Sequence, residues 1–103
     1  MGAIWPLMLG MTIALRVTMV VRAMPPGEYA MPLTTLVAMV EEIWPKTYLL
    51  DDEVEDVLRA LGDLDAQDRA MAEIANAPRT FLFDSLYANA DGIVFVKFER
   101  KVA

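Results

Sequence analysis

The residues best suited to chemistry in this chain are carboxylates, because the sequence contains no histidine and no cysteine. Histidine is the commonest general base and transition-metal ligand, and cysteine supplies thiolate nucleophiles. Asp84 and Glu99 fall on the two strands of a predicted hairpin, where paired carboxylates could divide acid and base roles. Nothing in the sequence sets this pair in a pocket, and Ser85, Thr80 and Tyr87 have no histidine to activate them. We therefore predict a protein without catalytic, cofactor-binding or metal-binding residues.

The carboxylates are concentrated in residues 51–68, where Arg59 is the only base. The net charge of the whole chain is −6, so this segment holds the negative excess. Its second half spaces carboxylates as a calcium loop does, but the EF-hand pattern needs glycine where Asp68 stands. Helix capping and solubility account for acids of this kind. The functional alternative is a surface that docks on a basic protein or imitates nucleic-acid charge, formed by Asp51, Asp52, Glu53, Glu55, Asp56, Asp63, Asp65 and Asp68.

The first 24 residues are apolar apart from Arg16 and Arg22. A transmembrane helix needs about 20 apolar residues, and Ile4–Val21 nearly qualifies, but Arg16 would lie near the bilayer interior. From Met11 onward, large apolar residues alternate with small or polar ones, as they do in a half-buried strand. The alternation favours a long amphipathic strand over residues 11–24, with both arginines on its exposed face.

Residues 1–10 contain Trp5-Pro6 and are expected to form an irregular apolar arm. So apolar a segment either closes the protein's own core or packs against another chain. The second alternative predicts a homodimer or a subunit of a larger assembly. The contact would be made by apolar residues of the arm and the strand: Trp5, Leu7, Leu9, Ile13, Leu15 and Val17.

The middle of the chain predicts three helices, separated from the N-terminal strand by the turn-forming Pro25-Pro26-Gly27. Apolar residues at helical spacing place them at residues 32–44, 51–61 and 65–76. Asp51 or Asp52 is expected to cap the second helix, and Gly62 to end it. The third helix has apolar positions at Ala70, Met71, Ile74 and Ala75. Asn76 is expected to end it in the left-handed conformation.

Residues 79–102 predict a β-hairpin. Thr80–Tyr87 is rich in aromatic residues, Ile93–Arg100 is β-branched and aromatic, and the loop between them ends in Asp91-Gly92. Apolar and charged residues alternate along the second strand, so one face of the hairpin must be covered by helices. The predicted fold class is therefore α+β, with an N-terminal amphipathic strand, three helices and a C-terminal hairpin in a single domain of residues 1–103.

The element order from Pro32 to Val102 resembles a winged-helix domain, with the hairpin as the wing and residues 65–76 in the place of the recognition helix. The resemblance rests on the order helix, short extended stretch, helix, turn, helix, hairpin. It implies either DNA binding through the third helix or use as a protein-contact module. The charges depart from DNA binding, because Arg69 is the only base of the third helix and the wing loop carries Asp91 without any base.

These patterns lead to three interpretations of function. The first is a small non-enzymatic interaction module, serving as a regulator, inhibitor or assembly subunit, that self-associates and binds a basic protein through its acidic helix pair. The second is a winged-helix transcriptional regulator that binds DNA, and the third is a membrane-anchored small subunit that uses Ile4–Val21. The charge pattern favours the first, so neither nucleic acid nor a cofactor is expected to bind. The absence of cysteine suits a reducing compartment, and we expect a cytoplasmic protein.

Overall fold

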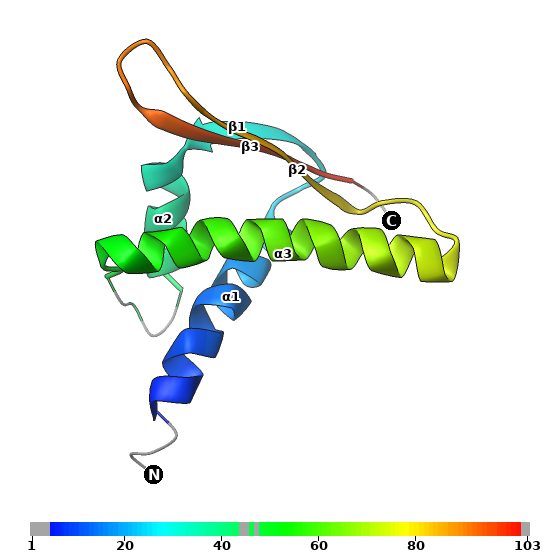
Figure 1. Ribbon diagram of the computed structural model, residues 1–103, viewed down its shortest axis with the longest axis horizontal. Helices are drawn as coiled ribbons and strands as arrows, with labels where there is room; N and C mark the ends of the chain where they lie inside the picture. The colour runs from blue at the N-terminus through cyan, green and yellow to red at the C-terminus, as the bar shows by residue number, and fades with distance from the viewer. Residues whose placement is uncertain (1–4, 44–45, 47, 102–103) are drawn as a thin grey trace.

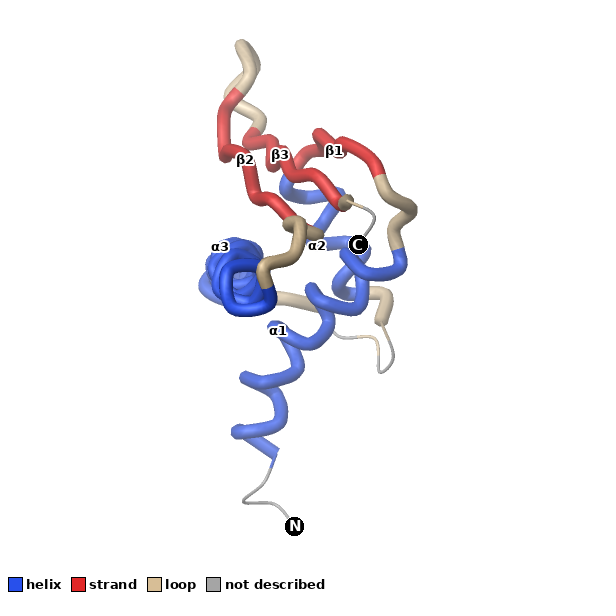
Figure 2. The backbone as a smooth tube through the Cα atoms, turned by 90° about the vertical axis from the view of Figure 1, so that its right-hand side faces the viewer, coloured by secondary structure: helices blue, strands red, loops and turns tan. Residues whose placement is uncertain are grey.

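The described part of the chain combines three helices with a three-stranded antiparallel sheet, which confirms the α+β class (Figure 1). The computed structural model describes residues 5–43, 46 and 48–101, with side chains described from Ile13 onward. In chain order the elements are α1 (Trp5–Ala23), β1 (Gly27–Pro32), α2 (Leu33–Glu41), α3 (Asp51–Ala75), β2 (Phe81–Ala88) and β3 (Val94–Arg100). The sheet lies over α2 and α3, and α1 rises past α3 toward the sheet (Figures 1 and 2).

The hairpin predicted at the end of the chain is confirmed. β2 and β3 pair antiparallel, and the alternation along β3 buries Val96 and Phe98 while Lys97 stays exposed. In the connecting loop, the Oδ1 atom of Asn89 accepts the backbone N–H of Asp91 at 3.0 Å. The local sequence was enough to predict this element because strand composition and loop chemistry agree.

The third strand of the sheet is not the one predicted. β1 pairs antiparallel with β3, giving the strand order β1-β3-β2. Tyr29 stacks on Phe98 with ring centroids 5.5 Å apart, so β1 helps to cover the central strand. The sequence does contain a short strand-like alternation here, because the large apolar residues Tyr29 and Met31 alternate with Glu28 and Ala30. It was hidden because it lies between a Pro-Pro-Gly turn and Pro32, residues that usually interrupt strands.

The strand predicted over residues 11–24 is wrong, because Trp5–Ala23 is a helix. The irregular arm over residues 1–10 is likewise wrong from Trp5 onward, and residues 1–4 lie outside the described part of the chain. Residues buried on α1 and just after it recur at helical spacing: Ile13, Arg16, Val17, Val20, Val21 and Met24. Arg16 is only 3% exposed, so the expectation that both arginines face solvent fails. The helical period escaped notice because an arginine occupies a core-facing position.

α2 forms where predicted, after Pro32, and buries Leu36 and Val40. The two helices predicted after it are one, α3, which runs without a break through Gly62. Glycine inside a helix costs about 1 kcal/mol relative to alanine. Burial of Val57 and Leu61 just before this glycine, and contacts of α3 beyond it, outweigh that cost. The turn between two helices, on which the winged-helix resemblance depended, does not form in this described segment.

The ends of α3 agree only partly with the sequence analysis. Leu50 takes the N-cap position that was predicted for Asp51 or Asp52, and its backbone N–H donates to Glu53 Oε1 at 3.1 Å. Asn76 ends the helix in the left-handed conformation, with φ of 50°, as predicted.

The core lies where the three helices meet the inner face of the sheet. Its fully buried side chains come from both layers and are Phe98, Leu36, Leu61, Val17, Val40, Val57 and Val96. The last turns of α3 extend beyond this core, so Met71 is 64% exposed and Ile74 is 81% exposed. Apolar residues predicted for the third helix therefore lie at the surface.

Candidate functional site

Two of the predicted partner-binding acids, Asp65 and Asp68, instead hold the start of the hairpin on α3. Arg79 lies between them, and its Nε donates to Asp68 Oδ2 while its Nη2 donates to Asp65 Oδ1, both at 2.8 Å. Asp68 also accepts the backbone N–H of Thr80 at 3.0 Å, the Thr80 hydroxyl, and the backbone N–H of Phe81 at 3.3 Å. The three charged side chains are largely buried. We call Asp65, Asp68 and Arg79 the hairpin clamp.

The hairpin clamp lowers the pKa of Asp68. Burial, the largest single influence, raises this pKa, but hydrogen bonds from Thr80, Arg79 and Phe81 together outweigh it and lower the pKa from 3.8 to about 2. A carboxyl group whose pKa is depressed by folding stabilises the protein above its unfolded pKa. The contribution is therefore complete above about pH 4 and is lost as the pH falls through 2. The carboxylate is thus a structural group rather than a free binding group.

The other six predicted partner-binding acids lie in the first half of α3 and differ in how free they are. Glu53 accepts the N–H of Leu50, and Asp56 pairs with Arg59 at 2.8 Å. The remaining four are exposed, and we call them the acidic face: Asp51, Asp52, Glu55 and Asp63. The acidic surface is therefore smaller than the sequence predicted, because clamp and cap interactions occupy part of it.

The predicted self-association residues are divided between the faces of α1. Ile13 and Val17 are buried in the protein's own core, whereas Leu15 is 57% exposed. Met19, one turn after Leu15, is 55% exposed and lies on the same side of α1, although it was not among the predicted residues. The first turns of α1 contain Trp5, Leu7 and Leu9, whose side chains lie outside the described part of the chain. The free apolar surface of α1 therefore includes Leu15 and Met19.

The carboxylate pair considered for acid–base chemistry lines one hollow on the sheet surface, but the two residues are not cross-strand partners. Glu99 stands opposite Leu82 in the sheet, so it does not face Asp84. Asp84 Oδ2 lies 3.7 Å from Lys97 Nζ instead, and both side chains are exposed. This arrangement is an exposed ion pair on the sheet surface, where such pairs contribute little to stability.

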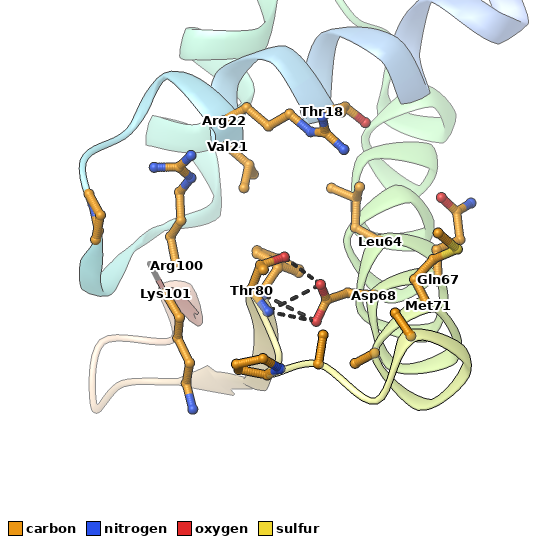
Figure 3. A pocket seen from close by; sticks show the side chains of 16 residues that line it. Thr18, Val21, Arg22, Leu64, Gln67, Asp68, Met71, Thr80, Arg100 and Lys101 are labelled. Atoms are coloured by element: carbon orange, nitrogen blue, oxygen red, sulfur yellow. Dashed lines mark hydrogen bonds between the residues drawn. The ribbon is translucent and has the colours of Figure 1, made fainter. Parts of the chain in front are cut away.

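A groove of about 610 Å³ opens between α1, the last turns of α3 and the ends of the sheet strands (Figure 3). Its floor is largely apolar and includes Val21, Leu64, Met71, Ala72, Ala75 and Phe81. Arg22, Arg100 and Lys101 line it as well. Asp68 also contributes, with its carboxylate turned to Thr80 (Figure 3). The sequence analysis missed this groove because its walls come from segments far apart in the chain.

A membrane helix over Ile4–Val21 was one alternative from the sequence. No described helix has the length and apolar character needed to cross a bilayer. Over the same described residues, no three carboxylates converge as metal ligands would. No protein-family model, curated protein sequence or solved structure matches the chain.

Proposed function

We propose that this protein is a small non-enzymatic interaction module that self-associates through α1 and binds a basic protein on the acidic face. The exposed apolar side of α1 carries the proposal. The first half of this helix extends away from the other elements, and Leu15 and Met19 stand more than half exposed on the following turns (Figures 1 and 2). Exposed apolar surface of this kind marks interaction sites in soluble proteins. A regulator, an inhibitor or an assembly subunit would each work through such contacts.

The acidic face supports the second contact. Its four acids project from the first half of α3, and the second half of this continuous helix is joined to the hairpin by the hairpin clamp. Opposite charge on a partner would speed encounter and make binding sensitive to salt. Phosphate backbones carry the wrong sign for this surface, so duplex DNA is the disfavoured partner.

Self-association is tested by placing charge on the exposed side of α1. We expect Leu15→Glu/Met19→Glu to weaken the oligomer by at least about tenfold in dissociation constant, because two carboxylates would enter an apolar contact. Sedimentation velocity over a concentration series measures the change. The matched control is Ile74→Glu/Leu86→Glu, which alters two exposed apolar residues outside α1 and should leave the association unchanged. A wild-type protein that stays monomeric at about 100 μM, or a control that dissociates equally, would contradict the assignment to α1.

The acidic face is tested with a synthetic helical peptide whose polar residues are all lysine. We expect Asp52→Asn/Glu55→Gln/Asp63→Asn to weaken its binding by about tenfold at physiological salt, since three charges at the contact are lost. The control Glu28→Gln/Asp84→Asn/Asp91→Asn removes the same charge from exposed sites elsewhere and should have less than about twofold effect.

A gel shift tests the competing function, which is DNA binding. Retardation of a specific DNA duplex at sub-micromolar protein concentration would favour the DNA-binding alternative.

A further inference from the structure

Three solvent-accessible cations, Arg22, Arg100 and Lys101, gather at one place. Across the described residues, the ion pairs use Lys46, Arg59, Arg69, Arg79 and Lys97. Arg22, Arg100 and Lys101 belong to none of these pairs, and all three line the groove beside α3. Arg100 is held there by a hydrogen bond from its Nη1 to the carbonyl oxygen of Met24 at 2.7 Å. In a chain with a net charge of −6, this groove is therefore a local cationic site.

The groove floor offers apolar surface between these cations. Leu64 packs partly buried against the core, and Met71 and Ala75 continue the same side of α3 beyond it, where both are exposed. Asp68 is the only carboxylate along the described lining, and the hairpin clamp already occupies it. An incoming carboxylate would consequently meet three cations and no free anion of the groove.

We propose that this groove binds an amphipathic helix of a partner protein, one whose apolar face is flanked by Asp or Glu. Apolar side chains of such a helix would enter the floor, where the flexible Met71 can adapt to them, and its carboxylates would reach the cations. The wall from Leu64 to Ala75 is about 16 Å long, which matches about three helical turns. The groove is partly open to solvent, as a surface for a helix needs to be, because the polar side of that helix remains in water.

The α1 helix of a second copy is a poor match for the same groove. Trp5–Ala23 contains no acid, and its charges, Arg16 and Arg22, have the same sign as the groove. The exposed side chains of Leu15 and Met19 also lie outside the groove lining. The groove and the self-association surface are therefore separate, and experiments can contradict the proposal for one surface while supporting the proposal for the other.

The test uses two three-turn helical peptides with identical leucine positions, one flanked by glutamate and the other by lysine. Fluorescence anisotropy with the intact protein should show binding of the glutamate peptide, weakened at least about fivefold by Arg22→Gln/Lys101→Gln. Met71→Gln should weaken the same peptide by about threefold or more, because it places a polar amide on the apolar floor. Neither the Arg22→Gln/Lys101→Gln variant nor the Met71→Gln variant should alter binding of the lysine peptide, which is expected to bind on the acidic face.

Matched controls separate the groove from general charge and surface effects. Arg59→Gln/Lys97→Gln removes two cations elsewhere, and Ile74→Gln replaces an exposed apolar residue of α3 outside the groove. Both should change binding of the glutamate peptide by less than about twofold. The proposal is overturned if the glutamate peptide does not bind at about 100 μM or if the controls weaken it as much as the groove variants. It is also overturned if the groove variants instead change the sedimenting mass, which would assign the groove to a second copy of the chain.

Discussion

Replacing Asp68 with alanine should lower the free energy of unfolding by about 3 kcal/mol, although the substitution removes no apolar side chain from the core. The change leaves the guanidinium of Arg79 without one of its two carboxylates. It also removes the acceptor for the backbone N–H of Thr80 and Phe81, at the first residues of the hairpin. Hydrogen bonds to a charged group contribute about 1.5–3 kcal/mol, and donors left unsatisfied in a buried place add to the loss. Thermal and urea unfolding at one fixed protein concentration measures the difference.

The control for this variant is Asp63→Ala, on the same helix. Asp63 is exposed and makes no described hydrogen bond through its side chain, so its removal should change stability by less than about 0.5 kcal/mol. Both substitutions gain the same helix propensity, which cancels in the comparison. If the two variants lose equal stability, the hairpin clamp does not hold the sheet to α3. Arg79→Ala combined with Asp68→Ala should cost less than the sum of the single changes, because both remove one shared interaction.

The pH dependence gives a second measure of the same interaction. With a pKa of about 2 in the folded protein and 3.8 in the unfolded chain, Asp68 contributes about 2 kcal/mol at neutral pH. Wild-type protein should lose this amount between about pH 4 and pH 2, beyond any loss shared by other carboxyl groups. The Asp68→Ala variant lacks that part of the acid sensitivity. Equal slopes in this pH range would show that the pKa of Asp68 is not depressed by folding.

The features that the sequence predicted well are local. The hairpin, the helix after Pro32 and the left-handed Asn76 each depend on residues within a few positions of one another. Loop chemistry, a proline at a helix start and an asparagine at a helix end act through nearby backbone atoms. No distant segment needed to be known for these predictions to succeed.

The features that were missed depend on contacts between distant segments. Arg16 occupies a core position of α1, and an arginine there conceals a helical period. Asp65 and Asp68 looked like free surface acids because nothing nearby in the chain reveals that Arg79 will reach them. Gly62 looked like a helix end because the interactions that carry α3 through it are made with other elements. The candidate sites were therefore harder to predict than the elements that carry them.

Replacing Val17 with aspartate should prevent folding or cost more than about 4 kcal/mol, because the side chain of Val17 has no exposed surface. The same change at Leu15, two residues earlier and more than half exposed, should cost less than about 1 kcal/mol, most of it helix propensity. On a strand these residues would share one face, and the two substitutions would lower stability equally. On a helix the two residues lie on opposite sides. Far-UV circular dichroism and thermal melting of dilute protein distinguish the two cases, and equal damage at both positions would overturn the assignment of faces on α1.

The two substitutions also separate folding from association. A Leu15→Asp protein that melts like the wild type in dilute solution but sediments as a smaller species would place the self-association contact on the outer side of α1. Dilution matters because association itself raises the melting temperature of any protein that binds its own folded form. If the Leu15→Asp protein instead keeps the wild-type mass, the apolar surface that holds copies together lies elsewhere. The exposed tip of the hairpin, with Leu86, Tyr87 and Ile93, would then be the next surface to alter.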